Sequence, residues 1–148
     1  MNTWIVVADA GRARIFETGI LRDELKEVRS LVHPSSRLKT SELVSDRPGR
    51  VAKGAGHSAM EARTAAHDVE ADEFAATVAD ELDKALERRE CSDIVLVVPP
   101  RFLGRLRVRI SQRVLNAVRK TLAKDLSQMS AHDLTAALGG MLTVRATA

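Results

Sequence analysis

The fold is decided by two stretches of the chain, Trp4-Ile-Val-Val-Ala8 and Ile94-Val-Leu-Val-Val98. Each is an uninterrupted apolar run rich in residues with high β propensity, a pattern typical of buried strands. The second run is ended by Pro99-Pro100. We therefore predict a strand buried on both faces at the first run and a central strand of the sheet at the second.

The elements next to these strands follow from shorter signals. Asp9-Ala-Gly-Arg12 predicts a turn in which Gly11 supplies conformational freedom, so a second strand over Ala13–Glu17 forms a hairpin with the first. A third strand is expected over Leu25–Val32. Asp68–Arg89 is predicted to be a helix, because apolar residues recur there every four positions, at Phe74, Val78, Leu82 and Leu86.

The last third of the chain predicts three more helices and one strand. Pro100 suits the first turn of a helix, and Ser111 suits the N-cap of the next, in which Val114, Leu115 and Val118 are expected to face inward. A short strand is expected over Thr121–Leu126. Ser130 and Asp133 resemble a capping box for a final helix that Gly139-Gly140 ends.

This order is β-β-β, long loop, α, β, α, α, β, α. An antiparallel start followed by alternating helices and strands predicts an α/β protein (an α+β mixed sheet) with helices on its faces, in the ribonuclease-H-like order of elements. We expect one domain over residues 1–148, with a long basic loop at about 33–67 and a loose tail at 141–148.

Composition narrows the class of protein. The chain has 148 residues, of which 45% are hydrophobic and 29% charged, values typical of a compact soluble domain. Its only cysteine, Cys91, excludes a disulfide framework and a cysteine zinc cage. The histidines form no close pair with metal-ligand spacing, so no metal or cofactor is predicted. No signal peptide or membrane-spanning run is visible, which predicts a cytoplasmic protein without membrane insertion.

Nuclease chemistry on this fold would need several carboxylates around two metal ions. Asp9 ends the first strand, but the central strand carries no acid that could act with it. Asp9 is therefore predicted to be a turn residue.

The predicted loop concentrates basic residues and glycines. The residues that we select there as candidates for binding are Arg50, Lys53, Gly54, Gly56, His57 and Arg63. Glycine permits close approach of the backbone to a ligand, and histidine exchanges protons near neutral pH, which makes His57 the candidate catalytic residue. The alternative is an exposed histidine without a chemical role.

A second basic group follows the central strand. Arg101, Arg105 and Arg109 share one helix face by their i, i+4 spacing, and no acid occurs from Pro99 to Leu122. These arginines are predicted to bind phosphates, including those of ribosomal RNA. The alternatives are solubilising charge and pairing with the acidic start of the Asp68–Arg89 helix.

Three segments resemble the bacterial host attachment protein family: Trp4-Ile-Val-Val-Ala-Asp-Ala-Gly-Arg-Ala-Arg-Ile-Phe-Glu17, Gly54-Ala-Gly-His-Ser-Ala-Met-Glu61 and Val97-Val-Pro-Pro-Arg-Phe-Leu-Gly104. That family is similar to the middle domain of archaeo-eukaryotic peptide-chain release factors, and the resemblance implies a ribonuclease-H-like fold. In release factors the long loop carries Gly-Gly-Gln, which assists hydrolysis of peptidyl-tRNA. Here the equivalent loop reads Gly54-Ala55-Gly56-His57, without the glutamine.

Three functions fit these observations. The first is a non-catalytic factor that binds the ribosome or RNA through the basic loop and the arginines. The second is a protein-binding module that affects attachment indirectly from the cytoplasm. The third is a hydrolase that acts on peptidyl- or aminoacyl-tRNA-type esters through His57. We expect a binding protein rather than an enzyme.

Overall fold

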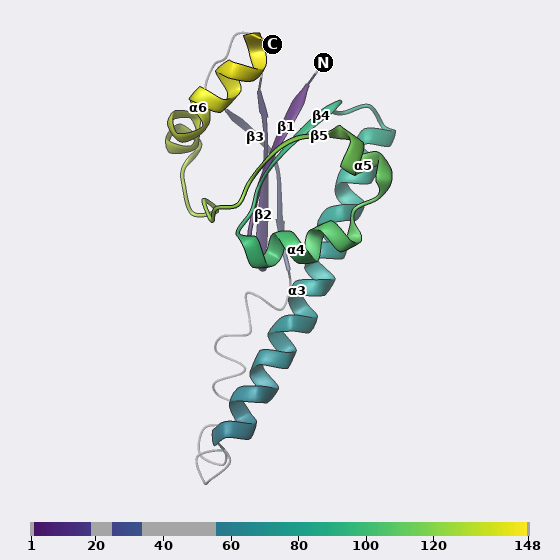
Figure 1. Ribbon diagram of the computed structural model, residues 1–148, viewed down its shortest axis with the longest axis vertical. Helices are drawn as coiled ribbons and strands as arrows, with labels where there is room; N and C mark the ends of the chain where they lie inside the picture. Colours follow the sequence, from purple (N-terminus) through teal and green to yellow (C-terminus); the bar gives the residue numbers. More distant parts are fainter. Residues whose placement is uncertain (1, 19–24, 34–55, 148) are drawn as a thin grey trace.

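The computed structural model describes residues 2–18, 25–33 and 56–147, with the backbone alone at 56–65 and 140–147 (Figure 1). Its sheet has five strands in the order β3-β2-β1-β4-β5. β1 pairs antiparallel with β2 and parallel with β4; β2–β3 is antiparallel and β4–β5 is parallel. The predicted mixed sheet with an antiparallel start is confirmed. The strands are β1 Thr3–Ala8, β2 Arg12–Thr18, β3 Lys26–Val32, β4 Asp93–Val97 and β5 Val118–Leu122.

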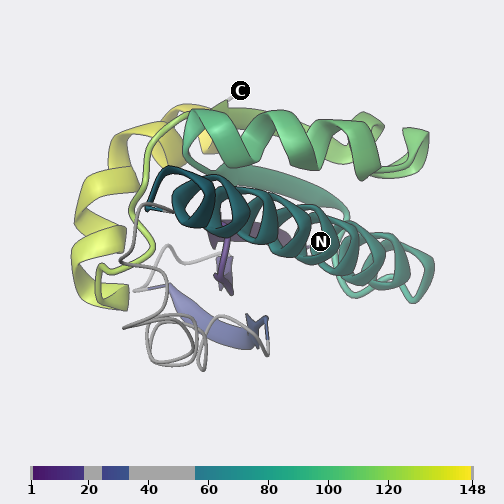
Figure 2. The ribbon, with the colours of Figure 1, turned by 90° about the horizontal axis from the view of Figure 1, so that it is seen from below.

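Four helices are described: α3 Gly56–Glu87, α4 Pro100–Arg109, α5 Gln112–Ala117 and α6 Ala131–Thr147. α3, α4 and α5 cover one face of the sheet, and α6 covers the other (Figure 1). Seen from below, α3 and α4 run side by side (Figure 2). No helix among residues 56–147 is both long and apolar enough to cross a membrane.

The alternation of side chains along β1 explains its continuous apolar sequence. Val6 is buried in the core that contains Phe74 of α3. Ile5 and Val7 point the other way, into a second core with Leu134 of α6. A strand with a helix layer on both faces needs apolar residues along its length, and the five apolar residues Trp4–Ala8 of β1 are all buried.

The predicted hairpin is confirmed, and Asp9 is its turn residue. The Asp9 Oδ1 atom accepts hydrogen bonds from the backbone N–H groups of Gly11 at 2.9 Å and Arg12 at 3.0 Å. The Asp9 N–H in turn donates to the Arg12 carbonyl at 2.9 Å. These bonds close the chain tightly between β1 and β2, so that Asp9 stands beyond the end of β1.

The start of the long helix was predicted wrongly. α3 begins at Gly56 rather than at Asp68, so residues 56–67, expected in the loop, are helical. These early turns project beyond the sheet (Figure 1). A helix with no sheet beneath it has no apolar stripe to bury, but this segment is rich in alanine, the strongest helix former. The prediction relied on periodic apolar residues, so it missed a segment that has helix propensity without that periodicity.

The segment after α4 differs from its prediction in register. The Ser111 cap is confirmed, since its hydroxyl accepts from the Val114 N–H at 3.2 Å. Leu115, however, is 51% exposed rather than inward-facing. Val118 begins β5 instead of ending the helix, and this strand lies over 118–122 rather than 121–126. The β-branched Val118 prefers the extended backbone, which accounts for the earlier strand.

The final helix was predicted too short. Its cap is confirmed by the hydrogen bond from the Asp133 N–H to the Ser130 hydroxyl at 3.0 Å. α6 then continues through Gly139 and Gly140 to Thr147, so the expected loose tail is helical up to that residue. A glycine inside a helix costs only about 1 kcal/mol relative to alanine. The strong helix formers on both sides, such as Leu138 and Met141, compensate for that cost.

Candidate functional site

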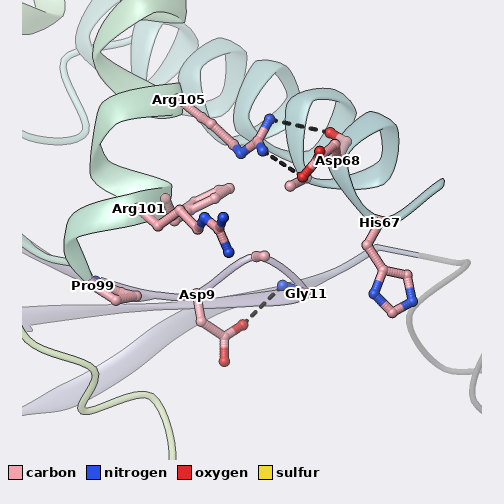
Figure 3. A pocket seen from close by; sticks show the side chains of 10 residues that line it. Asp9, Gly11, His67, Asp68, Pro99, Arg101 and Arg105 are labelled. Atoms are coloured by element: carbon pink, nitrogen blue, oxygen red, sulfur yellow. Dashed lines mark hydrogen bonds and ion pairs between the residues drawn. The ribbon is translucent and has the colours of Figure 1, made fainter. Parts of the chain in front are cut away.

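A crevice opens at the carboxyl ends of the parallel neighbours β1 and β4. Asp9 follows β1, and Pro99 follows β4 immediately before α4 begins (Figure 3). In open sheets of this kind, ligands bind outside the carboxyl ends of the strands. The crevice has a volume of about 510 Å³ and is lined by Asp9, Ala10, Gly11, His67, Asp68, Ala71, Pro99, Arg101, Phe102 and Arg105.

Both carboxylate oxygens of Asp9 are already in use. Oδ1 accepts the hydrogen bonds of the turn, and Oδ2 lies 2.9 Å from the Ser127 hydroxyl, which is also 2.7 Å from Asp125 Oδ1. The side chain of Ser127 is buried in the segment that follows β5, so Asp9 ties that segment to the hairpin. No group of three metal-ligating side chains occurs among the residues whose side chains are described. Asp9 thus has a structural role at the floor of the crevice.

Arg105 fastens α4 to α3. Its Nη2 atom lies 2.7 Å from Asp68 Oδ1, and its Nη1 atom lies 2.9 Å from Asp72 Oδ1. Nη1 also donates to the Asp68 carbonyl at 3.3 Å. Arg105 therefore pairs with acidic residues of α3, which was one of the alternatives for the arginine group.

Arg101 and Arg109 differ from Arg105. Both are exposed, and neither makes a hydrogen bond or ion pair with any residue that the structure describes. Together with Arg105 they line a second hollow of about 430 Å³, which adjoins the crevice. The three arginines predicted to share one face do so, and we call them the α4 arginine face. Figure 3 shows the Arg101 side chain reaching into the crevice between Arg105 and Asp9.

The amino end of α4 adds positive potential to this face. Pro99 is the N-cap and provides no side-chain hydrogen bond, and Pro100 lacks an N–H. Leu103 N–H bonds to the Pro99 carbonyl at 2.9 Å, which leaves the N–H groups of Arg101 and Phe102 at the open end of the helix. The helix dipole is positive there. Its field supplements the charge of Arg101 at the mouth of the crevice.

The other candidate residues are distributed differently. Arg50, Lys53 and Gly54 lie outside the described residues. Gly56 and His57 form the start of α3, and Arg63 follows on the same helix, so these three are not loop residues. The side chains of His57 and Arg63 are also outside the described part, and the proposed role of His57 in ester hydrolysis remains a prediction.

His67, which sequence reasoning passed over, lines the crevice from α3. A signal for the crevice was present in the sequence. Asp9 and Pro99 each directly follow a strongly apolar strand, and parallel neighbours bring such ends together. Nothing local to His67 distinguishes it, because its place depends on how α3 crosses the sheet.

The fold and the site define an α+β protein whose mixed sheet carries a ligand-sized crevice beside a row of arginines. The family model described as "Protein required for attachment to host cells" matches residues 4–138. The chain therefore belongs to the host attachment family. No curated protein matches the chain.

Proposed function

We propose that this host-attachment-family protein is a non-catalytic cytoplasmic factor that binds the phosphate backbone of RNA, including ribosomal RNA, through its α4 arginine face. Any effect on attachment is then indirect. The observation that carries the proposal is the pair of exposed arginines, Arg101 and Arg109, on one side of a helix. They have no partner in the described structure, whereas Arg105 between them is held by Asp68 and Asp72.

The chemistry of guanidinium groups favours phosphate as the ligand. Arginine binds phosphate oxygens with two parallel hydrogen bonds and is less strongly hydrated than lysine. Residues 99–124 contain no Asp or Glu, so α4, α5 and β5 contribute only positive formal charges. Contacts to phosphate do not depend on base sequence and weaken as salt rises.

Two further observations support binding rather than catalysis. Asp9, the carboxylate at the crevice floor, accepts two backbone hydrogen bonds through Oδ1, and its Oδ2 contacts the Ser127 hydroxyl. Asp68 is neutralised by Arg105. Both acids of the crevice lining therefore have partners within the chain. The order of strands and helices is compatible with the ribonuclease-H-like fold of release-factor middle domains. Our proposal therefore includes that this chain is related to those domains.

Co-sedimentation with ribosomes tests the proposal. We expect the wild-type protein to bind at low salt and to dissociate at moderate salt. Arg101→Gln/Arg109→Gln should sediment much less at low salt. The matched control is Arg88→Gln/Arg107→Gln, which removes two exposed arginines that lie outside the α4 arginine face. Equal losses in both double variants would mean that binding follows net charge, and would contradict the assignment to this face.

A further inference from the structure

A third hollow lies at the amino ends of β1 and β4, whereas the crevice lies at their carboxyl ends. It has a volume of about 600 Å³ and forms where α3 ends, β1 and β4 begin and α5 passes into β5. Figure 1 shows α5 beside the carboxyl end of α3 in this region. Its lining residues are Asn2, Leu86, Arg89, Cys91, Ser92, Arg113, Asn116, Ala117 and Arg119. We call it the Arg89 pocket.

The lining carries three arginines and, among the described residues, no Asp or Glu. Both hollows near α4 include acids in their lining, so the lining of the Arg89 pocket has the highest formal positive charge of the three. The Arg113 Nε atom is 3.9 Å from Asp83, a loose contact. Arg119 holds Asp93 through Nε at 2.7 Å, which leaves both of its terminal nitrogens for another partner. Each of these two side chains is more than half exposed.

Arg89 has a backbone that arginine rarely adopts. Its φ is 60°, the left-handed region. It stands at the end of α3, where its N–H bonds to the Leu86 carbonyl at 3.1 Å and the next N–H, of Glu90, bonds to the Ala85 carbonyl at 2.9 Å. This is the Schellman arrangement, which strongly favours glycine at the position that Arg89 occupies.

Strained backbone positions cluster at functional sites, so an arginine in a position that favours glycine suggests a function for its side chain. The Arg89 side chain makes no hydrogen bond or ion pair with the described residues, so no partner within this part of the protein explains it. A ligand in the pocket would supply that partner. Strain at one residue combined with a cavity lined by three cations points to a binding site.

The other lining residues indicate which chemical groups the ligand has besides phosphate. Leu86, Cys91 and Ala117 form an apolar surface, and Asn116 retains its amide N–H₂ group because only its Oδ1 is bonded, to Gln112. The volume lies in the range of small-molecule sites. We propose that the Arg89 pocket binds a small molecule with at least two phosphate groups and an aromatic ring whose face packs on the apolar surface, the chemistry of a nucleoside di- or triphosphate.

Isothermal titration calorimetry with ADP, pyrophosphate and adenosine tests this proposal on the full chain. We expect ADP to bind more tightly than pyrophosphate and adenosine not to bind detectably. No heat of binding with ADP would overturn the proposal. Equal affinities for ADP and pyrophosphate would overturn the assignment of the apolar surface to a ring.

Two substitutions of the same residue separate the ligand contact from the backbone strain. Arg89→Gly and Arg89→Gln should each weaken ADP binding by about tenfold or more, the effect expected for loss of a hydrogen-bonded ion pair. Arg89→Gly should also raise Tm by about 3 °C, because it relieves the strain, whereas Arg89→Gln should not raise it.

The matched control is Arg88→Gln, which removes the same charge from the neighbouring exposed residue outside the pocket lining. ADP affinity should stay within twofold of wild type in this variant. Arg89→Gly with unchanged ADP affinity, or Arg88→Gln with the same loss as Arg89→Gln, would show that the Arg89 side chain is not a specific ligand contact and would contradict the site.

Discussion

The guanidinium of Arg105 lies 2.7 Å from the carboxylate of Asp68, and this ion pair joins α4 to α3 across the mouth of the crevice. Arg105→Ala should lower the free energy of unfolding by about 1–2 kcal/mol, a moderate loss because Asp68 is half exposed. Arg101→Ala should change it by less than about 0.5 kcal/mol. Urea unfolding of both variants checks this difference. Equal destabilisation would show that Arg105 does not fasten the two helices.

Phe74 is the aromatic centre of the contact between α3 and the sheet. It is 1% exposed, and its ring centroid lies 6.0 Å from that of Phe102 and 6.1 Å from that of His33. Phe74→Ala should cost about 3–5 kcal/mol, since it leaves a cavity in the core. Val69→Ala on the same helix, at a side chain that is 56% exposed, should cost under about 0.5 kcal/mol. A small loss in both variants, measured by thermal unfolding, would contradict the packing of α3.

Gly139 provides a direct test of the continuous last helix. Among the described residues, no atom outside the adjoining turns of α6 lies within 4 Å of the place where a Cβ would stand, and α6 continues through this residue. Gly139→Ala should therefore stabilise the protein by about 0.5–1 kcal/mol. If the helix instead ended here in a left-handed glycine cap, alanine would be destabilising. The sign of the change in Tm distinguishes the two structures.

The thiol of Cys91 should make stability depend on alkaline pH. Burial, helped by the nearby carboxylates of Glu90 and Asp93, raises the pKa of Cys91 from 9.0 to about 11. The unfolded chain therefore loses this proton first, so the contribution to stability is complete below pH 9 and is lost by about pH 11. The free energy of unfolding should fall by up to about 2 kcal/mol more in wild type than in Cys91→Ala over this interval. Parallel pH profiles for the two proteins would contradict the raised pKa.

Strong local signals accounted for most of the sheet and for the helix caps. β1 and β4 each consist of a continuous apolar run after one polar residue, and Ser111 and Ser130 cap their helices as predicted. The errors arose where two local tendencies compete. The first turns of α3 have helix propensity without an apolar stripe, and the glycines of α6 interrupt a segment of good helix formers.

The candidate site was predictable in part. The spacing of Arg101, Arg105 and Arg109 placed them on one face, and the structure confirms this arrangement. Which of them is already paired could not be read from the sequence, because the partners of Arg105 are at least 33 residues away and are brought close only when α3 packs beside α4. The Arg89 pocket has the same character, since its three arginines come from separate elements.

The salt dependence of RNA affinity tests the central claim most directly. Fluorescence anisotropy with two RNA strands of unrelated sequence would give the slope of log affinity against log salt for wild type and Arg101→Gln/Arg109→Gln. Loss of two phosphate contacts should make that slope shallower by about 1.5, equally for both strands. A slope unchanged by the double substitution would contradict phosphate binding by the α4 arginine face.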